Sequence, residues 1–133
     1  MKTIQYQVNA ELSVADVIRV FNASGIVRPT RDAARIEKMF AQANLVVSAW
    51  HEGALVGVAR GLTDHSYCCY LSDLAVDQVY QRQGIGGALL AQVRQVLGPE
   101  VSLVLLSAPE AMDYYPRVGF AHADNAFLIN RAR

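Results

Sequence analysis

The chain has 133 residues, which is enough for one domain with a hydrophobic core and too few for two ordinary domains. Hydrophobic residues make up 53% of it, which excludes a disordered chain. Twelve basic residues balance twelve acidic ones, which argues against a general electrostatic attraction to nucleic acid or to an anionic membrane. We therefore expect neither kind of partner.

The N-terminal residues contain no apolar segment typical of a secretory signal, and no apolar run approaches the roughly 18 residues of a membrane helix. Cys68 and Cys69 are adjacent, so on a strand they point to opposite faces and cannot form a structural disulfide. Two cysteines also fall short of the usual four ligands of a zinc site. We expect free thiols, a cytoplasmic location and no metal.

The first half of the chain predicts one strand, two helices and three further strands. Their expected ranges are 3–8, 14–23, 31–43, 45–51, 55–62 and 67–76. Ser13 and Thr30 are the expected N-caps of the two helices. The two strands at 45–51 and 55–62 form a hairpin around Glu52-Gly53, and the strand at 67–76 extends it to a meander.

The second half begins with a helix over 84–97 that Gly98-Pro99 ends. The continuously apolar segment 101–108 predicts a strand buried on both faces. A short helix follows, with Pro109 in its first turn and Pro116 ending or kinking it. Segments 119–123 and 126–131 are expected to form two closing strands. The element order is strand, two helices, three strands, helix, strand, helix and two strands, which predicts a single α/β domain, residues 1–133, with a mixed sheet.

Three glycines, Gly84, Gly86 and Gly87, stand at the start of the helix that follows residue 83. Each weakens a helix by roughly 1 kcal/mol relative to alanine, so their position requires a reason. One interpretation is a phosphate cradle, because glycines let the unpaired N–H groups of a helix N-terminus approach an anion. The other interpretation is close packing or an unusual turn, and spacing alone leaves both open.

Two common nucleotide motifs fit poorly. A P-loop requires Lys-Ser or Lys-Thr after its glycine, and here Gly86-Gly87-Ala88 stands instead. A dinucleotide-binding fold places its glycines after the first strand and an acidic residue near the end of the next strand. In this chain the glycines come late, and the next strand ends in Leu106-Ser107-Ala108.

The segment QRQGIG resembles the Gln/Arg-x-x-Gly-x-Gly/Ala motif of the GNAT family of N-acetyltransferases, with Gln81, Gly84 and Gly86 at the matching positions. The preceding DLAVDQVY is similar to the acetyl-CoA strand of that family. AMDYYPRVGF resembles its Ala-x-x-x-Tyr-x-x-x-Gly-Phe segment. The three segments lie in the order and spacing of the family, so the resemblance implies its fold over nearly the whole chain.

The resemblance implies that acetyl-CoA is the cosubstrate and that the backbone of Leu74 and Val76 lines its acetyl-pantetheine arm. The pyrophosphate suits the N–H groups at the helix start. Family members often carry an asparagine where Ser107-Ala108-Pro109 stands here, so its contact to the pantetheine arm is either lost or made by Ser107. The predicted cofactor-binding residues are Leu74, Ala75, Val76, Gln81, Arg82, Gln83, Gly84, Ile85, Gly86, Gly87, Ser107 and Tyr115.

Tyr115 is the predicted proton donor to the leaving thiolate, because a phenol with a pKa of about 10 stays protonated when a thiol of pKa about 8.5 departs. The alternative is a core aromatic residue beside Tyr114. Asp73 is the predicted group that takes the proton of the attacking amine or pairs with it, and a structural hydrogen bond is the alternative. Arg28 and Arg31 are expected to bind a carboxylate of the acceptor, or else to be surface charges.

The predicted function is acetyl transfer from acetyl-CoA to a primary amine of a small molecule or a protein, with a homodimer as one possible assembly. The first alternative is a module of the same fold that binds coenzyme A without catalysis. The second is an unrelated nucleotide-binding α/β protein, which the glycine spacing disfavours.

Overall fold

A five-stranded sheet organises the computed structural model, which describes residues 2–132. The strands lie in chain order across the sheet: β1 (Gln5–Val8), β2 (Leu45–His51), β3 (Ala54–Thr63), β4 (Cys68–Val76) and β5 (Ser102–Val104). The first four strands pair antiparallel, and β5 pairs parallel to β4. This mixed sheet confirms the predicted fold class.

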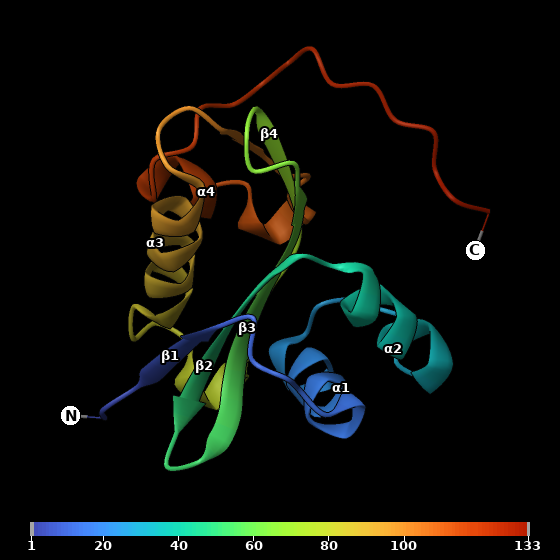
Figure 1. Ribbon diagram of the computed structural model, residues 1–133, viewed down its shortest axis with the longest axis vertical. Coiled ribbons are helices and arrows are strands. Elements are labelled where there is room, and N and C mark those ends of the chain that lie inside the picture. Colours follow the sequence, from blue (N-terminus) through green and yellow to red (C-terminus); the bar gives the residue numbers. More distant parts are fainter. Residues whose placement is uncertain (1, 133) are drawn as a thin grey trace.

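Helices cover both faces of the sheet (Figure 1). One face carries α1 (Val14–Ser24) and α2 (Ala33–Gln42), and the other carries α3 (Ile85–Leu97) and the short α4 (Tyr114–Arg117). Two 3-10 turns, η1 (Gln78–Tyr80) and η2 (Pro109–Ala111), precede α3 and α4. Because β4 and β5 are parallel neighbours, α3 is the expected crossover between them.

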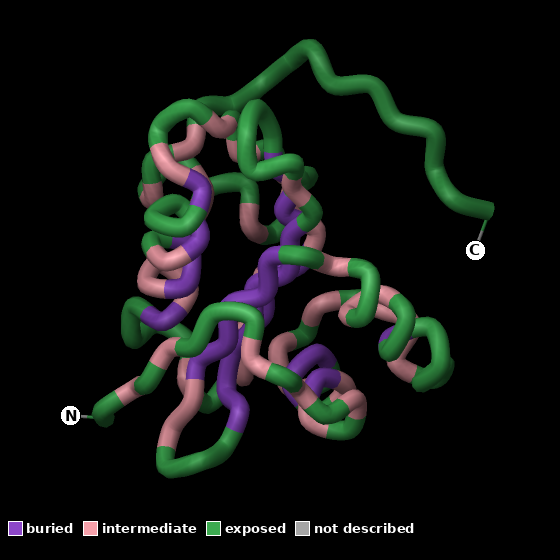
Figure 2. The backbone as a smooth tube through the Cα atoms, viewed as in Figure 1, coloured by how far each residue is buried: buried purple, intermediate pink, exposed green. Residues whose placement is uncertain are grey.

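The core forms two layers, one on each face of the sheet, and the buried backbone in Figure 2 follows the central strands and the inward sides of α1 and α3. On the α3 face, Leu89 and Val93 pack against side chains such as Val47. On the α1 face, Phe21 and Ile36 pack over Val58. Within the described residues, no helix is long and apolar enough to cross a membrane.

The N-cap of α2 differs from the prediction. Asp32, rather than Thr30, caps the helix, because its carboxylate accepts the N–H of Arg35 at 3.1 Å. The Thr30 hydroxyl instead donates to Asn22 Oδ1 at 2.8 Å. The helix therefore begins at Ala33, two residues later than expected, whereas Ser13 caps α1 as predicted by accepting the N–H of Asp16.

Three predictions for the last third of the chain are wrong. The apolar segment after residue 100 forms a strand of three residues only, and β5 is not buried on both faces, since Ser102 and Val104 are exposed. The one short helix expected from Pro109 is divided into η2 and α4, and Pro116 lies within α4. Residues 119–132 contain no strand, so the two closing strands are absent from this part of the structure. An apolar run does not reveal whether both faces are covered, and here α3 covers one.

A β-bulge interrupts the pairing of β3 with β4. Arg60 pairs with Asp73 and Gly61 pairs with Leu71, so Ser72 is the extra residue in β4. Beyond the bulge, Ala75 packs on the α1 face while Leu74 and Val76 pack on the α3 face. Asp73 and Ala75 therefore share a face of β4 that is opposite to Leu74 and Val76.

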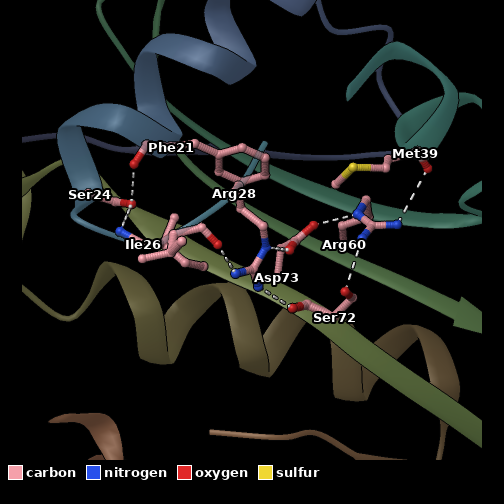
Figure 3. Close-up of polar contacts among 9 residues, drawn as sticks. Phe21, Ser24, Ile26, Arg28, Met39, Arg60, Ser72 and Asp73 are labelled. Carbon is pink, nitrogen blue, oxygen red and sulfur yellow. Dashed lines mark hydrogen bonds and ion pairs between the residues drawn. The ribbon is translucent and has the colours of Figure 1, made fainter. Parts of the chain in front are cut away.

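A buried ionic cluster anchors the bulge to the loop after α1 (Figure 3). The Asp73 carboxylate accepts hydrogen bonds from Nε of Arg28 and Nε of Arg60. Arg60 also donates to the Ser72 hydroxyl at 3.0 Å, and Arg28 donates to the Ser72 carbonyl oxygen at 2.7 Å. The Asp73 side chain is completely buried, so two cations compensate one carboxylate that has left water.

We expect Asp73→Asn to lower the free energy of unfolding by about 3–5 kcal/mol, because it leaves two largely buried guanidinium groups without their counter-ion. Asp16→Asn is the matched control. It removes the same charge from the exposed Asp16–Arg19 pair, where a loss below about 1 kcal/mol is expected. Chemical denaturation measures both. A folded Asp73→Asn variant with unchanged stability would contradict the structural role of Asp73.

Candidate active site

A cavity of about 680 Å³ opens between the second half of β4 and the segment that follows β5. The two strands pair only from Cys68–Ser102 to Tyr70–Val104. Beyond Tyr70, β4 continues for six residues while the chain after β5 turns towards η2. The C-terminus of α1, the start of α3 and α4 close the remaining sides.

The backbone of β4 presents unpaired polar groups to this cavity. The Asp77 N–H donates to the Val56 carbonyl oxygen at 2.9 Å, so this N–H points towards β3. Because successive N–H groups of a strand point to opposite edges, those of Leu74 and Val76 point towards the cavity. The Gln81 side chain donates to the Val76 carbonyl oxygen at 2.8 Å on the same edge.

The start of α3 supplies a second set of donors. Gly84 is its N-cap, with φ of 83°, a left-handed conformation that glycine adopts without strain. The first N–H bonded within the helix is that of Ala88, which donates to the Gly84 carbonyl oxygen. The N–H groups of Ile85, Gly86 and Gly87 therefore have no partner in the helix, and the helix dipole makes this end favourable for an anion.

The three glycines serve different purposes. A Cβ atom at Gly87 would meet nothing within 4 Å, so this residue leaves open space at the helix start. A Cβ atom at Gly86 would lie 2.8 Å from the Tyr114 hydroxyl oxygen, so this glycine admits a neighbouring side chain. The close packing expected as one interpretation is therefore present at Gly86, and the open space at Gly87 leaves room for the phosphate expected in the other.

Tyr115, from α4, is part of the cavity lining. Its ring packs edge-on against Tyr114 and Phe120, with centroid distances of 5.2 and 5.4 Å. Burial raises the pKa of Tyr115 above its ordinary value of 10.0; Tyr114 adds to this rise and the charge of Arg28 opposes it. The hydroxyl therefore keeps its proton at neutral pH and can donate it.

Most of the predicted site residues meet at this cavity. Those that line it are Arg28, Leu74, Ala75, Val76, Gln81, Arg82, Gly84, Ile85, Gly86, Gly87 and Tyr115. Gln83 and Ser107 are not part of the lining: Gln83 donates to the Val79 carbonyl oxygen at 3.3 Å, and the Ser107 hydroxyl donates to the Ala108 carbonyl oxygen at 2.7 Å. Arg31 is exposed outside it.

Asp73 does not line the cavity. Its side chain lies on the α1 face, and two arginines hold its carboxylate, which argues against Asp73 as the base for an amine. Arg28 does line the cavity, but its guanidinium donates to Asp73, to the Ser72 carbonyl oxygen and to the Val27 carbonyl oxygen. The Arg28 guanidinium is therefore primarily a member of the ionic cluster.

Several cavity residues lie outside the predicted list of site residues. The cavity lining also contains Ser24, Gly25 and Ile26. They lie there because Gln81 Nε2 donates to the Ser24 carbonyl oxygen and joins two segments that are 57 residues apart in the sequence. Glu110 is the one carboxylate among the described residues of the lining. Only the Gly25 C-cap, which ends α1, left a local signal; the other contacts arise from tertiary packing.

Metal ligands do not gather in the described part of the chain. Among residues 2–132, no group of three or more histidine, cysteine, aspartate or glutamate side chains is arranged to hold a metal ion. Cys68 is exposed and Cys69 is buried, and both are free thiols.

Comparisons with known proteins agree with this geometry. The model of the acetyltransferase (GNAT) domain matches residues 14–131. GCN5-related N-acetyltransferase 2 of Arabidopsis thaliana is 37% identical over 71 residues, which cover 52% of this chain and 28% of that protein. The chain thus matches little more than a quarter of that relative's length.

Two solved structures share the fold. A probable acetyltransferase of unknown function from meticillin-resistant Staphylococcus aureus has a TM-score of 0.80 at 20% identity, covering 97% of this chain and 100% of that one. An aminoglycoside acetyltransferase from an uncultured soil metagenomic sample has a TM-score of 0.73 at 25% identity, covering 98% and 97%. Since the domain model matches residues 14–131, a range that contains all the residues lining the cavity, the chain belongs to the GNAT acetyltransferase family.

Proposed function

We propose that this chain transfers an acetyl group from acetyl-CoA to a primary amine of a small molecule or a protein. One observation carries the proposal. The cavity is lined both by the strand and helix start that carry the unpaired backbone donors and by Tyr115, whose hydroxyl is protonated at neutral pH.

The residues present suit acetyl-CoA. The N–H groups of Ile85, Gly86 and Gly87 would hold the pyrophosphate, with Arg82 in the same loop as an added cation. The free edge of β4 would bind the pantetheine arm, whose amides require hydrogen-bonding partners in an extended groove. The volume of the cavity, about 680 Å³, lies in the range of ordinary ligand pockets.

Acetyl-CoA supplies the acetyl group as a thioester when bound. The Val76 N–H would donate to the thioester oxygen, where negative charge develops as the neutral amine nitrogen attacks the carbonyl carbon. The carbon–sulfur bond breaks and its electron pair goes to sulfur. The Tyr115 hydroxyl then gives its proton to the departing thiolate.

The attacking amine must lose a proton, and the described lining of the cavity holds one carboxylate, that of the exposed Glu110. Asp73 is bound by two arginines, and Glu110 lies beyond β5 in η2. We infer that water accepts this proton. An acceptor whose amine is largely neutral at working pH would react fastest.

An amine panel separates this function from a module that only binds coenzyme A. Thiol release from acetyl-CoA should depend on an added amine and saturate with it. The panel contains an aminoglycoside, because a structural relative of 25% identity is an aminoglycoside acetyltransferase, together with a polyamine and a lysine peptide. Binding of coenzyme A without turnover on any amine would favour the binding module.

The Gly87→Glu variant tests the phosphate cradle at the start of α3. The new carboxylate enters open space next to the unpaired N–H groups, so calorimetry should show acetyl-CoA affinity reduced at least tenfold, about 1.4 kcal/mol. Gly86→Glu is unsuitable because its side chain would collide with Tyr114.

Ala91→Glu places the same charge on an exposed residue one turn further along α3 and should leave this affinity unchanged. Equal affinities for the folded Gly87→Glu variant and the wild-type protein would refute the cradle.

Tyr115→Phe removes only the predicted acid. We expect kcat to fall by roughly 10²- to 10⁴-fold with acetyl-CoA binding nearly intact. Because burial raises the pKa of Tyr115, the wild-type rate should persist until the pH exceeds 10.0 and then fall as the hydroxyl loses its proton. This limb should be missing in Tyr115→Phe.

Tyr114→Phe is the control, since its ring is the neighbour of Tyr115 and its hydroxyl contacts the helix start. Its kcat should stay within about threefold of the wild-type value, well short of the loss expected for an acid group. A Tyr115→Phe variant with wild-type kcat at saturating substrate would assign Tyr115 to packing alone.

A further inference from the structure

The charges around the cavity are unequal. The described lining contains three arginines, Arg28, Arg82 and Arg117, and one carboxylate, that of Glu110. Arg82 lies in the loop before α3, where the pyrophosphate is expected, and Arg117 belongs to α4. Arg82, Arg117 and Glu110 are exposed, whereas Arg28 is partly buried. Because water and salt screen exposed charges, Arg28 contributes the strongest local field in the cavity.

The ionic cluster that contains Arg28 has one more positive charge than negative charges (Figure 3). Arg28 and Arg60 share the single carboxylate of Asp73. Within residues 2–132, no second carboxylate lies at ion-pair distance from either arginine. The side chain of Arg60 is 9% exposed and that of Arg28 is 25% exposed, so the excess charge has lost most of its water. An anion that approaches Arg28 from the cavity would compensate this charge.

Arg28 has hydrogen-bond donors available for such an anion. A guanidinium group carries five N–H groups. Three of them are used, since Nε donates to Asp73, one Nη donates to the Val27 carbonyl oxygen and the other to the Ser72 carbonyl oxygen. Each Nη nitrogen therefore keeps one further N–H. A carboxylate suits these donors, because arginine and carboxylate form strong charge-assisted hydrogen bonds.

The position of Arg28 along β4 separates it from the expected pyrophosphate site. The Ser72 carbonyl oxygen that Arg28 binds lies two residues before Leu74, and β4 then runs through Val76 towards the loop that precedes α3. Arg28 and the start of α3 therefore lie at opposite ends of this stretch of β4. The charge of Arg28 also lowers the pKa of Tyr115 against the effect of burial, so the guanidinium lies near the predicted acid.

We propose that the acceptor carries a carboxylate as well as an amine, as an amino acid does, and that Arg28 binds this carboxylate. The inference rests on the proposed function and names the class of acceptor at the same site. The remaining N–H groups of Arg28 hold the carboxylate at one end of the open stretch of β4. The amine then lies further along the strand, where the thioester is expected.

The same charge selects against acceptors that carry several ammonium groups. Arg28 repels a second cation, and this repulsion is strong where little water separates the charges. A positive neighbour also favours the neutral form of an amine, which is the form that attacks the thioester. A polyamine or an aminoglycoside should therefore react more slowly than an amino acid whose carboxylate neutralises the excess charge.

Three amino acids of increasing length test the inference: glycine, 4-aminobutanoate and 6-aminohexanoate, each compared with its own carboxamide. The carboxamide keeps the amine and the size of the molecule but removes the negative charge. With rates expressed per neutral amine, at least one acid should have a kcat/KM at least tenfold above that of its amide, which corresponds to about 1.4 kcal/mol.

Arg28→Gln removes the guanidinium charge and leaves Arg60 and Asp73 as a balanced pair. The ratio of kcat/KM between acid and amide should fall to about one. Arg31→Gln is the matched control, because it removes the same charge from an exposed residue of the same loop outside the cavity lining, and it should keep the ratio. Thermal unfolding checks that both variants fold. Arg28→Lys, which keeps the charge without the guanidinium, should lower the ratio partly and replaces Arg28→Gln if that variant does not fold.

Calorimetry separates this inference from the proposed function because it requires no turnover. Protein saturated with coenzyme A is titrated with the N-acetyl forms of the three acids and of their amides. At least one acid should bind at least tenfold more tightly than its amide, and Arg28→Gln should remove the difference. If this difference is present but no amine is acetylated, the enzymatic function is refuted and the carboxylate site stands. Acids that neither react nor bind better than their amides would overturn the inference, as would a preference that the Arg28 variants leave unchanged.

Discussion

The structure depends on a strand that is hydrogen-bonded along only a third of one edge. β4 pairs with β3 from Cys69 to Val76, apart from the bulge at Ser72, but with β5 only at Cys68, Cys69 and Tyr70. Buried backbone groups without partners are costly, so an unpaired strand edge in a cavity requires a ligand or water. The amides of Leu74 and Val76 thus define what the cavity accepts: an extended molecule with polar groups at strand-like spacing.

The bulge at Ser72 and the ionic cluster of Asp73 keep that edge open. Arg60 comes from the neighbouring strand and Arg28 from the loop after α1, so the carboxylate holds three segments together at the point where β4 turns away from β5. A buried charge cluster of this kind adds little net stability over an apolar core, but breaking it leaves uncompensated charge. The role of the cluster is therefore to fix the backbone path of β4. The pattern of apolar residues alone would allow more than one such path.

The sequence was sufficient for the elements whose signals are local. Helix caps, the Glu52-Gly53 turn and the glycine-led start of α3 all depend on residues within a few positions of each other, and these predictions were largely confirmed. The environment of Asp73 was not predictable, since its two cationic partners lie 13 and 45 residues away. The absence of strands in residues 119–132 was not predictable either. Alternating apolar residues indicate which side chains a strand would bury, but they do not indicate which strand would pair with it.

Two strand edges of this sheet, the second half of β4 and the outer edge of β5, have backbone N–H and C=O groups that no neighbouring strand satisfies among the described residues. At β4 the unpaired groups lie inside a cavity flanked by a helix N-terminus, so a small polar molecule of extended shape can satisfy them. At β5 the unpaired groups lie at the rim beside Leu62, Tyr70 and Val104, where a small molecule would leave these apolar side chains in water. The short length of β5 thus leaves the edge of β4 free within the cavity, whereas none of the three residues of β5 lines the cavity.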